Sequence, residues 1–323
     1  MKIKNLNLLV IPLAALMLAS CTQSQVPGTP GDADYSTLKI LAPTGAPSVA
    51  LYSFATSENF TTTTNPKTGL MPMFKTNNYD VIVAPTNGGL NQIVNQGANY
   101  KIAATITFGN FYIVSTGKDD DGVLDEGDTV LAFQETDVPG LVFKYVYSDL
   151  NLDFTWADDV SKTKVAIENG GSLKIDEVTT KEFDYIFTAQ PVVAATNSTI
   201  FKNVQDDFKT KSGGKIITQA SIFVNNNAAK DKVDALLAKI KSDIEDGLKD
   251  TTLFKTSIEQ LGEVKEQQDK FGVPGAMAMK VANMNNGFSL GYKSAKEIKE
   301  EISSFVNLVT NNAIGELSEE VFY

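Results

Sequence analysis

Residues 38–48 read Leu-Lys-Ile-Leu-Ala-Pro-Thr-Gly-Ala-Pro-Ser, and they give the clearest indication of the fold class. Its first five residues form a short apolar run that is typical of a buried strand. Turn residues follow at 43–47, and Ser48 stands where an N-cap would open an amphipathic helix over 49–54. Residues 80–89, Asp-Val-Ile-Val-Ala-Pro-Thr-Asn-Gly-Gly, repeat the order of strand, loop and helix. Repetition of this order predicts an α/β fold with an open parallel sheet.

The same alternation continues to the C-terminus. Apolar periodicity predicts further strands at 101–105, 110–116, 129–133, 164–167, 183–187, 215–218 and 221–224, and helices at 90–95, 141–150, 228–248 and 296–308. A second module starts near Asp128, and the chain crosses back around 215–224. We therefore expect lobe I at 38–117 plus 217–323, and lobe II at 118–216. A ligand cleft would separate them, with hinge crossings near 112–117 and 215–224.

The N-terminal segment carries the pattern of an export signal. Lys2 and Lys4 precede the apolar run 8–17, and Leu-Ala-Ser-Cys ends the segment at Cys21. This order is typical of a secretory signal peptide, here residues 1–20, and the run is shorter than the roughly 20 residues of a membrane-spanning helix. The last four residues resemble a lipobox, whose cysteine becomes a lipidated N-terminus. We expect an extracytoplasmic protein, anchored to the cell membrane through Cys21 and a flexible tether at 21–37.

Composition excludes several kinds of chemistry. The net charge is −11, and loss of residues 1–20 removes two lysines and no acid, which leaves −13. Such an acidic body argues against nucleic acid and against electrostatic docking on anionic lipid. The chain has no histidine and no arginine. Those absences remove the commonest general base and metal ligand, and the planar fork that binds sulfonates or carboxylates at two points.

Candidate ligand-binding residues lie in loops that follow the predicted strands. In open α/β sheets, ligands bind outside the carboxyl ends of the strands. Glycine allows close approach there, exposed main-chain amides begin the helices, and Thr, Asn and Gln side chains give directed hydrogen bonds. Phe108 is the best aromatic candidate, ahead of Phe111, Tyr112, Tyr52 and Trp156. The candidate residues are Thr44, Gly45, Ala46, Ser48, Thr86, Asn87, Gly88, Phe108, Asn110, Gln134, Thr136, Thr188 and Gln190.

Three of these stretches also carry a family resemblance. Residues 41–48, 80–87 and 132–140 (Ala-Phe-Gln-Glu-Thr-Asp-Val-Pro-Gly), with the C-terminal helices, resemble solute-binding lipoproteins of ABC importers, in the nitrate, sulfonate, taurine and thiamine-precursor branch. The resemblance spans about residues 38–308. It implies a two-lobed periplasmic-binding-protein fold of type II, without catalytic residues, cofactor or metal. It also implies a monomer that closes on a small solute and works with a permease and an ATPase.

Amide and hydroxyl groups beside aromatic rings favour a neutral or heteroaromatic solute, such as a vitamin precursor. A small anion such as a sulfonate, held by helix N-termini, is one alternative. An enzyme that uses carboxylates on the same fold is another. One eukaryotic relative of the branch builds the thiamine pyrimidine with an active-site histidine, which this chain lacks. A surface adhesin or scaffold would show repeats or long low-complexity segments, and the chain has neither.

The acidic run 119–128 raises the question of a calcium site. With Gly122 at the sixth position of an EF-hand loop, Gly117 would stand first and Asp128 twelfth. The first position needs a side-chain ligand and the twelfth a glutamate, so the match is poor. The run is therefore predicted as a solvated turn, with a structural cation as the alternative.

Overall fold

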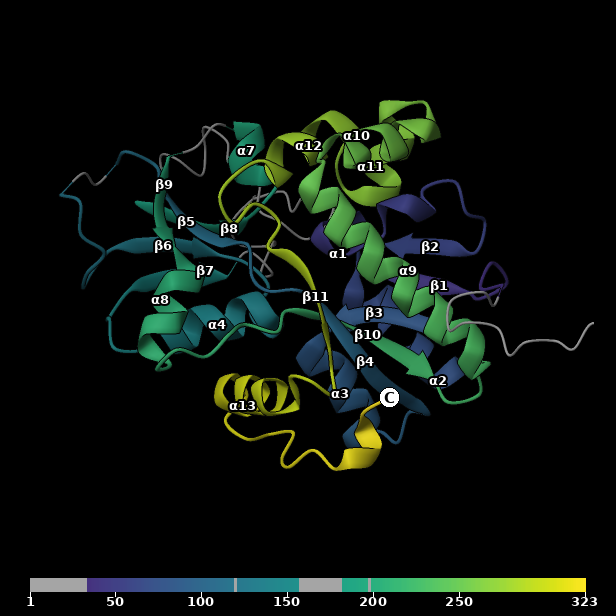
Figure 1. Cartoon of the computed structure of the whole chain (residues 1–323). Helices are drawn as coiled ribbons and strands as arrows, with labels where there is room; N and C mark the ends of the chain where they lie inside the picture. Colours follow the sequence, from purple (N-terminus) through teal and green to yellow (C-terminus); the bar gives the residue numbers. More distant parts are fainter. Residues whose placement is uncertain (1–33, 119–120, 157–181, 197–198) are drawn as a thin grey trace, which may run out of the picture.

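The computed structural model describes residues 34–118, 121–156, 182–196 and 199–323. The expected signal peptide, Cys21, most of the tether and the strand predicted at 164–167 lie outside the described residues. The described chain forms two α/β lobes, each built on one sheet (Figure 1). In the parts of the chain that the structure describes, no helix is both long and apolar enough to cross a bilayer.

The sheet of lobe I is centred on the two stretches that predicted the fold. β1 (Ile40–Pro43) pairs in parallel with β2 (Phe60–Thr63) and with β3 (Val81–Pro85). β1 and β3 are almost entirely buried, because helices cover both faces of the sheet, and for that reason they read as continuous apolar runs. The remaining strands are β4 (Tyr100–Thr107), β10 (Ala220–Asn225) and β11 (Leu290–Ser294), in the order β11-β4-β10-β3-β1-β2.

The sheet of lobe II has a matching plan. Its strands are β5 (Phe111–Ser115), β6 (Thr129–Ala132), β7 (Asp153–Trp156), β8 (Tyr185–Ala189) and β9 (Ile200–Asn203), in the order β7-β6-β8-β5-β9. β6 is parallel to β7 and β8, whereas β5 runs antiparallel to its neighbours. Each sheet has one interior strand that runs against the parallel strands, β10 in lobe I and β5 in lobe II. Each is the first strand that the chain forms after it has crossed from the other lobe.

The two crossings lie at 108–110 and at 212–219. The predicted lobe boundary at 117 placed residues 111–115 in lobe I, but these residues form β5 of the second sheet. Gly109 (φ 129°) and Asn110 (φ 98°) turn the chain between the lobes within a few residues, before the crossing predicted at 112–117. The strand predicted at 215–218 is also wrong, because these residues form the second crossing and pair with neither sheet.

Helices surround both sheets. Lobe I carries α1 (Ala46–Val49), η1 (Tyr52–Phe54), η2 (Pro66–Leu70), α2 (Met73–Thr76), α3 (Thr86–Val94), α9 (Lys230–Lys249), α10 (Thr252–Ile258), η3 (Glu259–Leu261), α11 (Val264–Phe271), α12 (Gly275–Ala282), α13 (Lys299–Val309) and η4 (Glu319–Val321). Lobe II carries α4 (Val138–Val146), α7 (Val192–Thr196) and α8 (Val204–Lys211). The long amphipathic helices predicted at 228–248 and 296–308 correspond to α9 and α13. α13 packs against both α3 and α4, and therefore touches both lobes (Figure 1).

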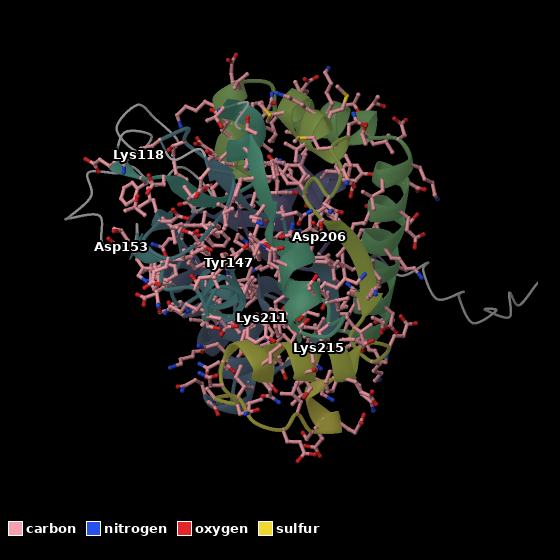
Figure 2. All side chains as sticks on the ribbon, turned by 90° about the vertical axis from the view of Figure 1, so that its left-hand side faces the viewer. Lys118, Tyr147, Asp153, Asp206, Lys211 and Lys215 are labelled. Atoms are coloured by element: carbon pink, nitrogen blue, oxygen red, sulfur yellow. The ribbon has the colours of Figure 1, made fainter. Side chains whose placement is uncertain are left out.

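Polar contacts hold α4 against α8 on the outer side of lobe II. The hydroxyl of Tyr147 donates to Asp207 Oδ2 at 2.7 Å, and Lys211 Nζ donates to the carbonyl of Val146 at 3.0 Å and to Asp149 at 2.8 Å (Figure 2). Burial, reinforced by the neighbouring carboxylate of Asp207, raises the pKa of Tyr147, so the phenol stays protonated and remains a donor. These contacts join α4 to α8 within lobe II.

A buried carboxylate makes lobe II sensitive to acid. Asp184 accepts hydrogen bonds from the amide of Thr129 (2.8 Å) and from its hydroxyl, and Lys118 Nζ lies 3.3 Å away. Burial opposes ionisation of Asp184, but these contacts outweigh it and lower the pKa of the carboxyl below 3.8. A carboxyl with a lowered pKa stabilises the fold above its unfolded pKa, and that stabilisation is lost as the pH falls through the folded value.

Asp184→Asn is therefore expected to lower the free energy of unfolding by about 2 kcal/mol at pH 7. The difference from the wild type should shrink as the pH falls below about 4, because the unfolded wild-type carboxyl then takes up a proton more readily than the folded carboxylate does. Urea unfolding at pH 7 and pH 3 measures it. Asp149→Asn, which removes a mostly exposed ion pair, should change stability little at either pH. An equal deficit of Asp184→Asn at both values would contradict the role of its charge.

Candidate functional site

The candidate site lies where strands of both lobes end. β1 and β3 of lobe I end at Pro43 and Pro85, and β6 and β8 of lobe II end at Ala132 and Ala189. The loops after these strands meet at one cavity, which residues of both crossings also line. This is the place that the topology of open α/β sheets favours for a ligand.

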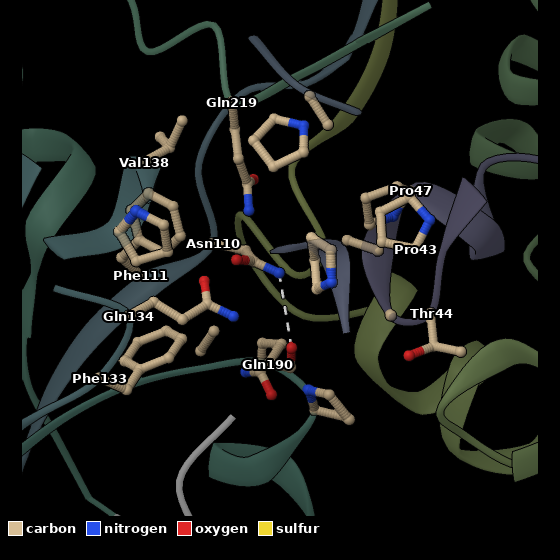
Figure 3. A pocket seen from close by; sticks show the side chains of 18 residues that line it. Pro43, Thr44, Pro47, Asn110, Phe111, Phe133, Gln134, Val138, Gln190 and Gln219 are labelled. Atoms are coloured by element: carbon tan, nitrogen blue, oxygen red, sulfur yellow. Dashed lines mark hydrogen bonds between the residues drawn. The ribbon is translucent and has the colours of Figure 1, made fainter. Parts of the chain in front are cut away.

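The cavity has a volume of about 70 Å³. Figure 3 shows Phe133, Gln134 and Val138 of lobe II on one side and Pro43, Thr44 and Pro47 of lobe I on the other. Asn110 and Gln219 reach it from the first and second crossings. The lining residues are Pro43, Thr44, Gly45, Ala46, Pro47, Pro66, Pro85, Asn110, Phe111, Phe133, Gln134, Val138, Pro139, Ala189, Gln190, Pro191, Gln219 and Ala220.

Two kinds of side chain dominate this wall. Four carboxamides supply directed hydrogen bonds, and six of the eleven prolines of the chain supply apolar ring faces. Among the described lining residues there is no Asp, Glu or Lys. A solute in the cavity therefore meets dipoles and apolar rings, and no formal charge from the described part of the wall.

Prolines also occupy the helix starts that face the cavity. Pro47 and Pro139 stand in the first turns of α1 and α4, Pro66 opens η2, and Pro85 is the N-cap of α3. A helix N-terminus binds anions through its free main-chain amides, and proline has no amide hydrogen to offer. The helix starts at this cavity are thus poorer in main-chain donors than the sequence predicted.

Asn110 is held rigidly where the first crossing meets the end of β8. Its side-chain amide donates to the carbonyl of Gln190 at 3.5 Å, and the amide of Gln190 donates to the carbonyl of Asn110 at 3.3 Å. The side chain of Gln190 in turn accepts from the amide of Ala194 at 3.0 Å, at the start of α7. Asn110 has a φ of 98°, a conformation in which non-glycine residues are uncommon outside constrained sites.

Gln134 has a comparable position in lobe II, with a φ of 54°. Its carbonyl accepts from the amides of Asp137 (3.2 Å) and Gly140 (3.1 Å), so the loop closes tightly on the first turn of α4. A Cβ on Gly140 would lie 2.3 Å from the carbonyl oxygen of Gln134, and glycine is therefore required for this approach. The close contact between loop and helix fixes Gln134 at the cavity.

Six of the residues proposed from the sequence line the cavity, namely Thr44, Gly45, Ala46, Asn110, Gln134 and Gln190. Asn87, Gly88 and Thr136 line an adjacent groove between α3 and α4, which shares Pro66 with the cavity. Phe108 lies in a different cavity with Lys209, Lys215 and Lys293, and the Lys293 ammonium stands 5.7 Å from its ring. Phe111, which ranked behind Phe108, does line the cavity.

Ser48, Thr86 and Thr188 have other surroundings. Ser48 is inside α1, whose N-cap is Gly45, and its hydroxyl donates to the carbonyls of Gly45 (2.9 Å) and Phe271 (3.3 Å). The hydroxyl of Thr86 lies 2.7 Å from that of Ser221, where it joins the end of β3 to β10. Thr188 is buried within β8, because this strand continues through Ala189 and the loop starts later than expected.

The other aromatic candidates have structural contacts. The hydroxyl of Tyr52 donates to the carbonyl of Asp243 at 2.9 Å, and that of Tyr112 to the carbonyl of Gly287 at 3.3 Å. Trp156 packs edge-on against Phe143 with ring centroids 6.0 Å apart, in the aromatic cluster of lobe II. None of the three is among the described residues of the cavity wall.

The acidic run is described only in part, because residues 119–120 lie outside the described residues. The carboxylate of Asp128 accepts from the amide of Asp125 at 2.7 Å and closes the turn before β6. Over the described ranges, no group of three or more His, Cys, Asp or Glu residues is arranged to hold a metal ion.

Four lining residues lie outside the strand-end loops that the sequence indicated. Gln219 ends the second crossing, Ala220 begins β10, and Phe133 lies between the end of β6 and Gln134. Pro66 follows β2, a strand that sequence periodicity missed. A local signal for Pro66 exists, because Asn65 next to it is a typical helix N-cap, and its side chain does accept from the amide of Thr68.

Comparisons with known proteins identify the architecture. No protein-family model matches the chain, and no curated protein matches its sequence. An ABC transporter protein of Parabacteroides distasonis superposes with a TM-score of 0.66 at 14% identity, over 89% of this chain and 99% of that one. The periplasmic aliphatic sulphonate binding protein of Escherichia coli gives 0.57 at 12% identity, over 85% and 87%.

A third solved structure names the fold itself. A Candida albicans protein described as having the generic periplasmic binding protein structural fold gives a TM-score of 0.52 at 13% identity, over 88% of this chain and 92% of that one. At such identities the likeness concerns architecture. Together with the two sheets and the paired crossings, it shows that the chain has the two-lobed periplasmic-binding-protein fold.

Proposed function

We propose that this chain is the solute-binding protein of an ABC importer, which closes its two lobes on a small organic solute and presents it to a permease and its ATPase. One observation carries the proposal. The cavity is built by the strand-end loops of both lobes and by both crossings, so that a bound solute would touch every part that moves on closure. The architecture shared with the ABC transporter protein of P. distasonis supports it.

The size of the cavity is consistent with a closed form. Its 70 Å³ holds two or three waters at about 30 Å³ each, whereas small-molecule sites usually measure about 300–1,000 Å³. A solute of organic size therefore enters only when the lobes part. The hinge would lie at 108–110 and 212–219, where the chain runs between the sheets.

We place the protein outside the cytoplasm as a monomer, attached to the cell membrane through lipidated Cys21 and the tether at 21–37. The support is the sequence pattern of residues 1–21 and the proline-, glycine- and threonine-rich composition of the tether. We assign it no catalytic activity, cofactor, resident metal or nucleic-acid partner. The absence of carboxylates among the described lining residues gives no support to a reaction that uses carboxylates.

The wall of the cavity favours an uncharged solute over a small anion such as a sulfonate. Amide dipoles, apolar rings and proline-capped helix starts suit a neutral or heteroaromatic molecule. A sulfonate remains the alternative, supported by the likeness to the E. coli sulphonate binding protein and to the Xanthomonas axonopodis alkanesulfonate-binding protein.

Intrinsic fluorescence of Trp156, the sole tryptophan, and of the tyrosines tests this function against a library of solutes. The library would include pyrimidine thiamine precursors, riboflavin and short sulfonates. A saturable change with the solute recovered intact is the expected result. Consumption of the solute would contradict a binding role and would instead support catalysis.

A further inference from the structure

Two buried oxygens at the cavity accept no hydrogen bond from the described protein groups. They are Asn110 Oδ1 and Gln219 Oε1, and the hydroxyl oxygen of Thr44 at the same cavity is likewise without a partner. Asn110 is only 2% exposed. A buried polar atom without a partner destabilises a protein, and native structures contain few of them. Three of the nine such oxygens among the described residues belong to this one cavity wall, where a bound solute could supply their partners.

The orientation of the Asn110 amide is fixed by its surroundings. Its nitrogen donates to the carbonyl of Gln190 at 3.5 Å, so the oxygen is the atom left without a partner (Figure 3). If the side-chain oxygen and nitrogen of Asn110 were exchanged, its oxygen would face the carbonyl oxygen of Gln190, and neither atom could donate. This side chain therefore presents an acceptor to the solute.

The position of Gln219 is fixed through its main chain. Its amide donates to the carbonyl of Thr107 at 3.0 Å, and its carbonyl accepts from the amide of Thr86 at 3.0 Å. These bonds join the second crossing to the ends of β4 and β3. Asn110 and Gln219 thus offer one acceptor from each crossing, and a solute that donates to both would connect the two segments that bend on closure.

The helix starts around the cavity offer few main-chain donors to an anion, so the donors that remain are the side-chain amides of Gln134, Gln190 and Gln219. Pro47, Pro85 and Pro139 replace main-chain donors at the helix starts, and the described lining residues contain no cationic side chain. An anion would meet partial negative charge on two amide oxygens with no cation nearby. A cationic solute would in turn be buried without a counter-charge. Both formal charges are disfavoured.

We infer that the solute is an uncharged molecule that donates N–H or O–H hydrogen bonds, such as a primary carboxamide or an amino-substituted ring, and that an anion of similar size binds more weakly. The inference rests on the proposed function and names the solute class of the same cavity. The donating group binds Asn110 Oδ1 and Gln219 Oε1, and the apolar part of the solute packs against proline rings.

Calorimetric titration of the full chain with three matched probes tests this assignment. Benzamide has two N–H donors, N,N-dimethylbenzamide has none, and benzenesulfonate carries acceptors and a negative charge. Benzamide is expected to bind at least tenfold more tightly than either of the others, the factor expected for one hydrogen bond of about 1.4 kcal/mol. Equal affinity for the two amides, or tighter binding of benzenesulfonate, would overturn the solute class while leaving a binding function in place.

Matched variants locate the effect. Gln219→Met keeps the length of the side chain but removes the acceptor, and is expected to weaken benzamide about tenfold without lowering the urea midpoint of the unligated protein. Gln92→Met is the control, since the buried Oε1 of Gln92 also lacks a partner but Gln92 is not in the cavity wall. It should leave benzamide affinity unchanged. Equal affinity of Gln219→Met and Gln92→Met would contradict the inference, whereas failure of every library solute to bind would contradict the proposed function itself.

Discussion

Gly140→Ala is expected to displace the Gln134 loop and to remove solute binding. The new Cβ would lie 2.3 Å from the carbonyl oxygen of Gln134 and 2.6 Å from Cα of Glu135, and both are backbone atoms that cannot rotate away. Either α4 or the loop must shift, at a cost of about 1–3 kcal/mol. Because Gln134 lines the cavity from this loop, its amide leaves the position that a solute would contact. Urea unfolding measures the loss of stability, and fluorescence titration measures the loss of affinity.

Gly88→Ala provides the matched control for stability. Gly88 also lies in the first turn of a helix, α3, but its added Cβ would meet the terminal methyl and sulfur of Met71 at 3.0 and 3.2 Å, with Pro85 Cβ at an ordinary 3.9 Å. The flexible side chain of Met71 can move, and alanine favours a helix over glycine by about 0.5–1 kcal/mol. Gly88→Ala should be as stable as the wild type or more so. Wild-type stability of Gly140→Ala would show that the loop is not held as described.

Phe143→Ala is expected to destabilise lobe II by about 3–5 kcal/mol. The ring of Phe143 is 1% exposed and lies between Phe187 (4.8 Å between centroids), Tyr147 (5.2 Å) and Trp156 (6.0 Å). Its removal leaves a cavity at the centre of the aromatic cluster that supports β6, β8 and α4. Because Trp156 is the sole tryptophan, its fluorescence reports the unfolding of this lobe directly.

Phe154→Ala tests whether burial, and not the loss of any aromatic ring, causes this effect. Phe154 contacts the same cluster, with its centroid 6.0 Å from that of Phe143, but it is 42% exposed. Its loss should destabilise lobe II by less than half as much as the loss of Phe143. Equal effects of the two substitutions would contradict the proposed core of lobe II.

The strands and helices that could be predicted are those whose buried residues form a clear apolar pattern in the sequence. β1 and β3 are covered on both faces and therefore read as unbroken apolar runs, and α9 shows buried Val233, Leu236, Ile240 and Ile244 at helical spacing. β7 and β11 are edge strands, with intermediate or exposed residues throughout. Their sequences, Asp-Phe-Thr-Trp and Leu-Gly-Tyr-Lys-Ser, contain no continuous apolar run, and neither strand was predicted.

The candidate site shows the same limit. Loops at the ends of buried strands could be predicted, and with them Thr44, Asn110, Gln134 and Gln190. Gln219 could not, because only the folded arrangement of the two crossings brings it to a cavity with Thr44, 175 positions earlier in the chain. Ser48 was proposed as a ligand-binding residue from its side-chain type, but its hydroxyl donates to main-chain carbonyls inside lobe I.

Closure of the lobes around a solute shortens the distance between them, and two spin labels, one on each lobe, measure that distance. Val123 of lobe II and Val264 of lobe I are 52% and 55% exposed, and Cys21 is the sole native cysteine. Val123→Cys and Val264→Cys in a chain with Cys21→Ser therefore carry exactly one label on each lobe. A saturating solute is expected to replace a broad distribution of longer distances with one narrow, shorter distance. An identical distribution with and without a solute that binds saturably would contradict the account.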